Sequence, residues 1–250
     1  DLNFLGFEEA IAAFLIESDD GPILIETGPH STYEPLSVQV KKVGYDIKEI
    51  KHVLLTHIHL DHAGAAWALA RNGAQIYVHP FGAGHLEKPG KLMESARRIY
   101  QDKMDMLWGE MNDIPASQII TPDDKEIIDI GGIQLEALYT PGHAKHHIAW
   151  KMGKTLFSGD VAGVRIGEGP VVPPCPPPDI NLEDWDQSID RILSSDIQEI
   201  YLTHFGITHE IASHFEQLQF ILKDWGDWIK ERWENGESVE EMTPKFSIYT

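Results

Sequence analysis

The 250-residue chain has one cysteine, few basic residues and no long apolar run. Cys175 alone cannot form a disulfide within the chain, which fits a reducing compartment such as the cytoplasm. Lysine and arginine total 20 against 40 aspartates and glutamates, a formal charge of −20. Such a surface repels phosphate backbones, so nucleic acid is not the expected partner. No run approaches the ~20 apolar residues of a membrane helix.

Two further absences concern leaders and nucleophiles. No leader of charged, apolar and small residues precedes Ala10, so we expect a signal peptide to be absent or already removed. No Ser-His-Asp or Cys-His arrangement stands out. Cys175 lies in a stiff proline-rich segment, residues 170–178, where no helix N-terminus or basic neighbour lowers its pKa. We therefore interpret it as a small filler and not as a nucleophile.

The first half of the chain alternates strand and helix patterns. Apolar runs at 11–16 and 23–26 flank a turn and predict a hairpin. Ser31 is expected to cap a helix that Gly44 ends. The remaining segments are a strand at 53–56, a helix at 61–71, a strand at 75–79 and a helical insertion at about 81–119.

The second half predicts an antiparallel meander, because short apolar runs are separated by tight glycine turns. The expected strands are 126–130, 133–139, 148–152 and 155–157. A helix at 182–193, a strand at 199–203 and a C-terminal helix at about 208–234 follow. Mixed strands and helices in two successive halves favour an α/β fold of two sheets packed face to face, in a single domain over residues 1–250.

The segment 57–62, His-Ile-His-Leu-Asp-His, places three imidazoles and a carboxylate directly after an apolar strand. An extended backbone directs residues i and i+2 to one side, so His57 and His59 can bind the same metal ion. Asp61 and His62 open a helical pattern and point elsewhere, which suits a second ion. Imidazole and carboxylate are ligands expected for zinc, iron or manganese.

Three further ligand-type residues occupy the same kind of position. His143, Asp160 and His204 each lie in the loop that leaves an apolar strand. Ligands at corresponding ends of several strands in a layered α/β fold can converge on one crevice. A lone histidine is usually structural, but this repeated context favours a metal centre.

With these motifs the chain resembles the metallo-β-lactamase superfamily of metal-dependent hydrolases. The resemblance is carried by His57-Ile58-His59-Leu60-Asp61-His62, Thr140-Pro141-Gly142-His143, Ser158-Gly159-Asp160 and Thr203-His204. It implies a four-layer αβ/βα sandwich, in which two mixed β-sheets are flanked by helices. It also implies two divalent metal ions, zinc being expected and iron or manganese being alternatives. The first ion would be held by His57, His59 and His143 and the second by Asp61, His62 and His204, with Asp160 bridging them.

The bridging Asp160 looks more like the thioesterase (glyoxalase II-like) and lactonase branches than like the β-lactamases, which often carry cysteine there. The lactonase branch usually has a tyrosine shortly after this aspartate, whereas Val161-Ala162-Gly163 follow here. The glutathione thioesterase branch has a basic C-terminal domain, whereas the tail here is acidic. The turn at Glu26 resembles the family's Asp-Thr-Gly turn with glutamate in place of aspartate, a change expected to alter packing near the site.

The resemblance implies a dinuclear metallohydrolase acting on a small molecule. A hydroxide bridged by the two ions would attack a carbonyl, a thioester or lactone being foremost, with Asp61 and Asp160 as catalytic residues. One alternative is an oxidoreductase with a single iron, similar to persulfide dioxygenases. Another is a phosphodiesterase acting on a small cyclic substrate.

Other residues carry weaker hypotheses. His147 is a candidate for a hydrogen bond to a ligand or to a loop backbone, with a merely structural role as the alternative. His146 is expected to face solvent and His79 to be structural. Tyr100 and Trp108 either pack the insertion onto the body or wall the substrate pocket as part of a lid. Arg165 meets either an anionic substrate group or a surface acid. An apolar stripe on the C-terminal helix packs on its own domain or, alternatively, forms a homodimer contact that Trp228 and Trp233 would favour.

Overall fold

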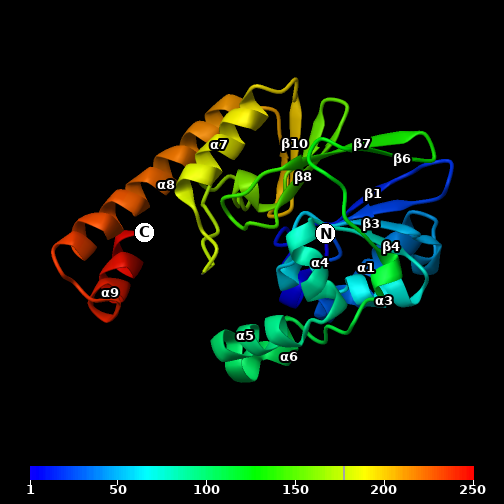
Figure 1. Ribbon diagram of the computed structural model, residues 1–250, viewed down its shortest axis with the longest axis horizontal. Coiled ribbons are helices and arrows are strands. Elements are labelled where there is room, and N and C mark those ends of the chain that lie inside the picture. Colours follow the sequence, from blue (N-terminus) through cyan, green and yellow to red (C-terminus); the bar gives the residue numbers. More distant parts are fainter. Residues whose placement is uncertain (177) are drawn as a thin grey trace.

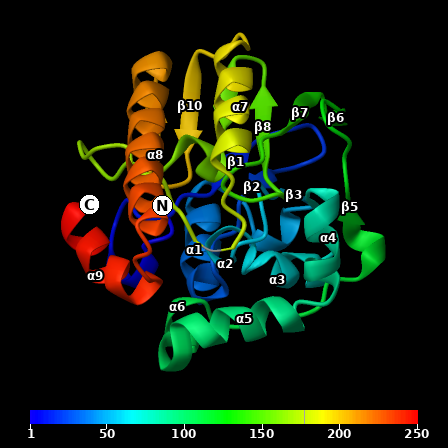
Figure 2. The same cartoon turned by 60° about the vertical axis from the view of Figure 1, so that its left-hand side comes forward.

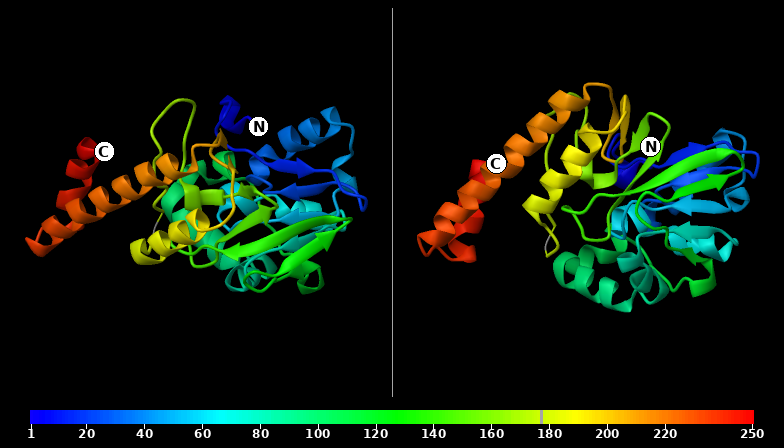
Figure 3. Two further views of the ribbon diagram at one scale, coloured as in Figure 1. Left: turned by 90° about the horizontal axis from the view of Figure 1, so that it is seen from above. Right: turned by 45° about the horizontal axis from the view of Figure 1, so that its top comes forward.

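The computed structural model describes residues 1–176 and 178–250, so Pro177 of the proline-rich segment lies outside the described residues. Two sheets lie face to face, and helices cover their outer faces (Figures 1 and 3). This is the predicted αβ/βα sandwich of two mixed sheets. No described helix is long and apolar enough to cross a membrane.

The first sheet has the strand order β1-β2-β3-β4-β5. Strands β1 and β2 pair antiparallel as the predicted hairpin, whereas β2 to β5 run parallel. The helices of this half connect the parallel strands and cover one face. The strands are Phe14–Ile16, Ile23–Ile25, His52–Leu54, Gln75–Tyr77 and Ile119–Ile120, and the helices are α1 Tyr33–Lys42, α2 Leu60–Ala63, α3 Ala66–Arg71 and α4 Pro80–Glu87.

The second sheet has the order β11-β10-β9-β8-β7-β6. The predicted meander forms its middle, and the parallel pairing of β9 with β10 makes the sheet mixed. Helices α7 Leu182–Leu193 and α8 Ile211–Glu234 cover its outer face. The strands are β6 Ile127–Ile130, β7 Ile133–Tyr139, β8 Ile148–Met152, β9 Thr155–Phe157, β10 Glu199–Leu202 and β11 Gly206–Thr208.

Three apolar clusters hold these layers together. One joins α1 and α3 to the first sheet, one joins α7 and α8 to the second, and the third lies between the sheets. In this third cluster Trp150 is fully buried, and its indole N–H donates to the Leu55 carbonyl at 3.0 Å. The bond satisfies the one polar group of this large buried ring and connects β8 to the segment that follows β3.

Two helical pieces lie outside the sandwich. Helices α5 Gly90–Tyr100 and α6 Met104–Leu107 lie below the helices of the first sheet (Figure 2). The end of α8 extends away from the sheets and carries α9 Val239–Tyr249 (Figure 1). Short 3-10 helices complete the chain: Phe4–Gly6, His30–Thr32, Ile47–Glu49, Gln101–Lys103, Ala116–Gln118 and Gly159–Ala162.

Several local predictions differ from the structure. Ser31 does not cap a helix, because its hydroxyl donates to the Leu107 carbonyl and α1 begins at Tyr33. The helix predicted at 61–71 is broken near Gly64, where a Cβ would lie 2.4 Å from the Leu60 carbonyl oxygen. The insertion is helical over about its first two thirds and ends in β5, while β11 and α9 were not predicted at all.

The alternative in which Trp228 favours a homodimer contact is also wrong. Its ring is buried against Phe246 and Tyr249 of α9, with centroids 5.2 and 5.4 Å away. The unpredicted α9 thus covers the side chain that the sequence alone would leave for a partner. Trp233 remains 65% exposed, and a homodimer contact through α8 stays a prediction.

Candidate metal centre

The loops that leave β3, β7, β9 and β10 meet at one edge of the sandwich. Strands β7, β9 and β10 run in the same direction, because β8 is antiparallel to both β7 and β9 and β10 is parallel to β9. Their carboxyl ends therefore share an edge. The Thr56 carbonyl accepts a bond from the Ile148 N–H at 2.7 Å, which brings the loop after β3 to the same place. The topology thus places four ligand-bearing loops together.

The first group consists of His57, His59 and His143. The Nδ1 atom of His59 lies 2.9 Å from Nε2 of His57 and 3.0 Å from Nε2 of His143. His57 and His143 are fully buried. Three imidazole nitrogens that face one another in this way form a trigonal set of neutral ligands, which a divalent metal ion prefers.

The second group consists of Asp61, His62 and His204. Nε2 of His204 lies 3.4 Å from Oδ2 of Asp61 and 3.3 Å from Nε2 of His62. Nε2 of His62 lies 3.6 Å from the same carboxylate oxygen. This group supplies a negative charge that the first group lacks.

Asp160 lies between the two groups and faces each with a different oxygen. Its Oδ2 is 3.3 Å from Nε2 of His143, whereas its Oδ1 is 3.2 Å from Nε2 of His62 and 3.5 Å from Nε2 of His204. Oδ1 is buried without a hydrogen-bond partner. A carboxylate with one oxygen toward each group has the geometry of a bridging ligand.

The outward ring nitrogens fix the tautomers of two histidines. Nδ1 of His143 bonds the Pro174 carbonyl at 2.9 Å, and Nδ1 of His204 bonds the Ala10 carbonyl at 2.8 Å. A carbonyl can only accept, so both Nδ1 atoms carry the proton. Nδ1 of His57 lies 3.0 Å from the Thr56 hydroxyl, which can donate or accept. In the neutral rings of His143 and His204 the inward Nε2 atoms therefore carry the lone pairs, the arrangement that ligating histidines show.

His147 and Glu26 support the site from behind. Nε2 of His147 accepts the Asp160 backbone N–H at 3.1 Å, and its Nδ1 bonds the Thr140 hydroxyl at 2.8 Å. The contact of His147 with the ligand loop agrees with the sequence-based hypothesis. Glu26 is fully buried; its Oε1 accepts the Thr56 N–H, and its Oε2 lies 3.4 Å from Nδ1 of His62. The glutamate in the early turn thus reaches a candidate ligand directly.

Burial and charge divide the histidines into two classes. Burial, together with neighbouring imidazoles, lowers the pKa of His57 far below 6.5 and that of His59 to about 4. Burial acts against the charge of His62 too, but the Asp160, Asp61 and Glu26 carboxylates raise its pKa well above 6.5. Without metal, the first group is therefore neutral, whereas the second retains protons that a metal ion would have to displace.

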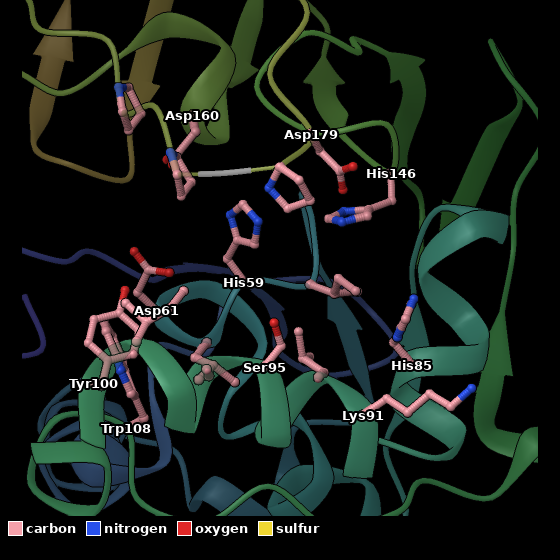
Figure 4. A pocket seen from close by; sticks show the side chains of 18 of the residues that line it. His59, Asp61, His85, Lys91, Ser95, Tyr100, Trp108, His146, Asp160 and Asp179 are labelled. Atoms are coloured by element: carbon pink, nitrogen blue, oxygen red, sulfur yellow. The ribbon is translucent and has the colours of Figure 1, made fainter. Parts of the chain in front are cut away.

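A cavity of about 510 Å³ opens beside both groups (Figure 4). Its walls come from α5 and from the proline-rich segment, and they are largely apolar. Tyr100 and Trp108 lie at one end, with His85 and Lys91 at the other. This volume is in the range of small-molecule sites.

Arg165 and His146 lie in different surroundings. Arg165 does not line this cavity, and its Nε is buried without a hydrogen-bond partner. The expectation that His146 faces solvent is wrong: it is 7% exposed and lines the cavity, and its Cβ lies 3.7 Å from the position of a Cβ on Gly82. Its position next to His147, just before β8, was the available signal. Adjacent residues of an extended chain point in opposite directions, so the sequence does not tell which of these two histidines faces the site.

The donor set fits metal ions, because all facing atoms are imidazole nitrogens or carboxylate oxygens and the tautomers leave the lone pairs inward. Within each of three groups the facing atoms all lie within 4.8 Å of one another. The third group, His57, His62 and Asp160, connects the other two.

Comparison with known proteins agrees with this arrangement. The family model of the metallo-beta-lactamase superfamily matches residues 6–204. The chain belongs to the metallo-beta-lactamase superfamily. The metallo-beta-lactamase fold-containing protein ST1585 of Sulfurisphaera tokodaii is 24% identical over 85% of this chain and 80% of its own length. In a structural comparison, the crystal structure of ST1585 matches with a TM-score of 0.70 at 25% identity, covering 84% of this chain and 81% of the other.

Two enzymes with more specific names match over part of the chain. The hydroxyacylglutathione hydrolase GloC of Haemophilus influenzae is 34% identical over 45% of this chain and 50% of its own length. An N-acyl homoserine lactonase of Bacillus sp is 27% identical over 54% of both chains. The match therefore spans about half of each enzyme.

Proposed function

We propose that this protein is a dinuclear metallohydrolase that cleaves a small thioester or lactone. The observation that carries the proposal is the position of Asp160, with one carboxylate oxygen toward each candidate ligand group. The names of two relatives, a hydroxyacylglutathione hydrolase and an N-acyl homoserine lactonase, support this substrate range. When bound, divalent ions would activate water near neutral pH and polarise a carbonyl.

The chain's own residues would divide the work as follows. His57, His59 and His143 would hold one ion, Asp61, His62 and His204 would hold the other, and Asp160 would contact both. Hydrogen bonds to the Pro174 and Ala10 carbonyls, and one between His57 and the Thr56 hydroxyl, keep the rings oriented. Preorganised ligands avoid a cost of reorientation during the reaction.

Asp61 has a second role in the proposal. Both Asp61 and Asp160 line the cavity, but the Asp61 carboxylate is 26% exposed and that of Asp160 only 4%. A partly exposed acid next to the substrate can deliver a proton to the leaving alkoxide or thiolate. Burial acts to raise its pKa, but His62 and His204 lower the value overall, so Asp61 would have to take up this proton during the reaction.

The cavity walls determine what kind of substrate would fit. Tyr100 and Trp108 are half-buried and face the candidate centre from one end. We assign them to the wall that holds an apolar part of the substrate. Arg165 would contact an anionic group of the substrate only where that group extends beyond the residues that line the cavity.

The decisive experiment measures metal content and hydrolysis together. We expect two equivalents of a zinc-like metal. In a panel of thioesters, lactones, β-lactams and phosphodiesters, we expect turnover of a thioester or a lactone. Asp160→Ala should lower the stoichiometry and reduce kcat/KM by at least about 100-fold. Asp190→Ala, an exposed aspartate on α7, is the control.

Unchanged activity and stoichiometry in Asp160→Ala would refute the bridging role. A single equivalent of iron would favour the oxidoreductase alternative, and turnover of phosphodiesters alone would favour the phosphodiesterase. The formal charge of −20 supports a small-molecule substrate over nucleic acid. The single cysteine supports a reducing compartment such as the cytoplasm.

A further inference from the structure

His146 is a buried polar side chain that the proposed reaction does not use. It is 7% exposed, and its Nδ1 is buried without a hydrogen-bond partner. Its ring points into the cavity, near Asp179 and His59 (Figure 4). Burying an unpaired polar atom costs free energy, so the surroundings of Nδ1 decide which ring nitrogen carries the proton.

The ring has one proton to offer, and the geometry decides where it is. A proton on Nδ1 would be a buried donor without an acceptor, whereas a proton on Nε2 leaves that donor free for the cavity. Burial, with the nearby His59 and His143, lowers the pKa of His146 to about 3, in keeping with a neutral ring. His146 therefore presents a neutral N–H donor.

The donor lies beside the first ligand group. The His146 and His59 ring centroids are 5.7 Å apart. A substrate atom that accepts a hydrogen bond from His146 would thus be separated by only a few covalent bonds from a substrate atom at the candidate metal centre. Helix α5 lines the same cavity with the apolar side chains of Leu92, Ala96 and Ile99, alongside the polar Lys91 and Ser95. Ile99 is 58% exposed, which leaves room for contact with a ligand.

We propose that His146 determines substrate specificity: it donates a hydrogen bond to a second oxygen next to the scissile carbonyl, while α5 holds an apolar chain. The substrate class is then an apolar acyl compound with a hydroxyl or amide oxygen close to its thioester or lactone. This inference rests on the proposed function, because it places the scissile carbonyl at the candidate metal centre.

A structural role is the competing explanation. The His146 and His57 rings are nearly parallel, with an interplanar angle of 15° and centroids 6.2 Å apart. Phenylalanine at position 146 can keep such packing but cannot donate a hydrogen bond. The substitution therefore separates the two roles.

The test is a binding measurement with two stable probes, octanoate and 2-hydroxyoctanoate, on the zinc-loaded protein by calorimetry. The hydroxyl can also contact a metal ion, so the signal is the change in preference between variants. We expect the preference of the wild type for the hydroxy acid to fall about 5-fold in His146→Phe, with octanoate affinity kept. His146→Gln, which retains an N–H donor, should keep most of the preference.

His52→Phe is the control, because this histidine bonds the Tyr77 hydroxyl away from the cavity. His146→Ala replaces His146→Phe if the latter does not fold. An unchanged preference, an equal loss for both acids or no binding of either acid would overturn the inference. Neither probe is hydrolysed, so a protein without hydrolase activity would refute the proposed function and still decide this inference.

Discussion

At the scale of single residues, His147 positions the loop that carries the candidate ligand Asp160. Its Nε2 accepts the backbone N–H of Asp160, and a Cβ on the intervening Gly159 would lie 2.7 Å from that nitrogen. Gly159 also has a φ of 53°, which favours glycine. The loop can therefore approach His147 closely, and this contact fixes the position of the Asp160 backbone and with it that of the carboxylate.

His147→Ala tests this positioning. The Asp160 N–H would lose its partner in a buried site, so we expect zinc affinity to fall by about 10- to 100-fold. The affinity is measured by competition with a chromogenic chelator. His52→Ala should leave it unchanged, and zinc affinity in His147→Ala equal to that of the wild type would contradict the assignment.

His79 supplies a pH dependence that is separate from the metal centre. Its Nδ1 accepts the Phe81 N–H at the start of α4, and burial lowers its pKa from 6.5 to about 4, against the opposing charge of Asp124. The unfolded chain takes up a proton between these values and the folded chain does not. The contribution to stability is therefore complete above about pH 6.5 and is lost as the pH falls toward 4.

His79→Asn removes this titration and keeps a side-chain acceptor at the helix start. From pH 7 to pH 4.5 the free energy of unfolding of the wild type should fall by about 1–2 kcal/mol more than that of the variant. Urea unfolding at several pH values measures the difference. Parallel curves for the two proteins would show that the folded state protonates His79 normally.

At the scale of elements, α9 is held by few side chains. Phe246 contacts Trp225 and Trp228 of α8, with ring centroids 5.4 and 5.2 Å away. A side-chain capping box at Ser238 begins the helix, and Pro244 lies inside it. An 11-residue helix is marginal by itself, so its stability depends on this aromatic contact.

Phe246→Ala should therefore open α9 locally. We expect a loss of about 2 kcal/mol, seen as faster hydrogen exchange of the α9 amides, with the sandwich unaffected. Ile248→Ala on the same helix is the control, since Ile248 is 87% exposed. Equal exchange in the two variants would mean that other contacts hold the helix.

The elements also show the limits of sequence patterns. β7, β8, β9 and α7 have the predicted bounds, because each is a clear apolar period between turn residues. β11 is three residues long and pairs only with β10, and such a short edge strand has little pattern of its own. At the break, Gly64 lies so close to the Pro29 backbone that a Cβ would be 2.9 Å from the Pro29 Cα, a contact that no local period encodes.

At the scale of the whole molecule, metal ions would connect the two sheets. His57 and Asp61 follow a strand of the first sheet, whereas His143, Asp160 and His204 follow strands of the second. Chelation of bound metal should therefore lower the Tm of the whole sandwich. At a free metal concentration of 100 times Kd the stabilisation is about 2.7 kcal/mol.

Differential scanning calorimetry with and without a chelator measures this effect. The shift should be smaller in Asp160→Ala, where one contact to each group is missing. An equal Tm with and without chelator, in protein shown to contain metal, would mean that the metal does not stabilise the fold. The single-domain organisation of residues 1–250 stays a prediction, which one cooperative transition would support.

The sequence by itself determined the superfamily, the order of the layers and the residues that gather at the edge. These depend on short-range periodicity and on ligand types that recur after strands, both visible along the chain. Only the tertiary structure decided which oxygen of Asp160 faces which group, that His146 points into the cavity and that α9 covers Trp228. Side-chain direction depends on contacts between segments far apart in the chain, and a one-dimensional pattern does not contain those contacts.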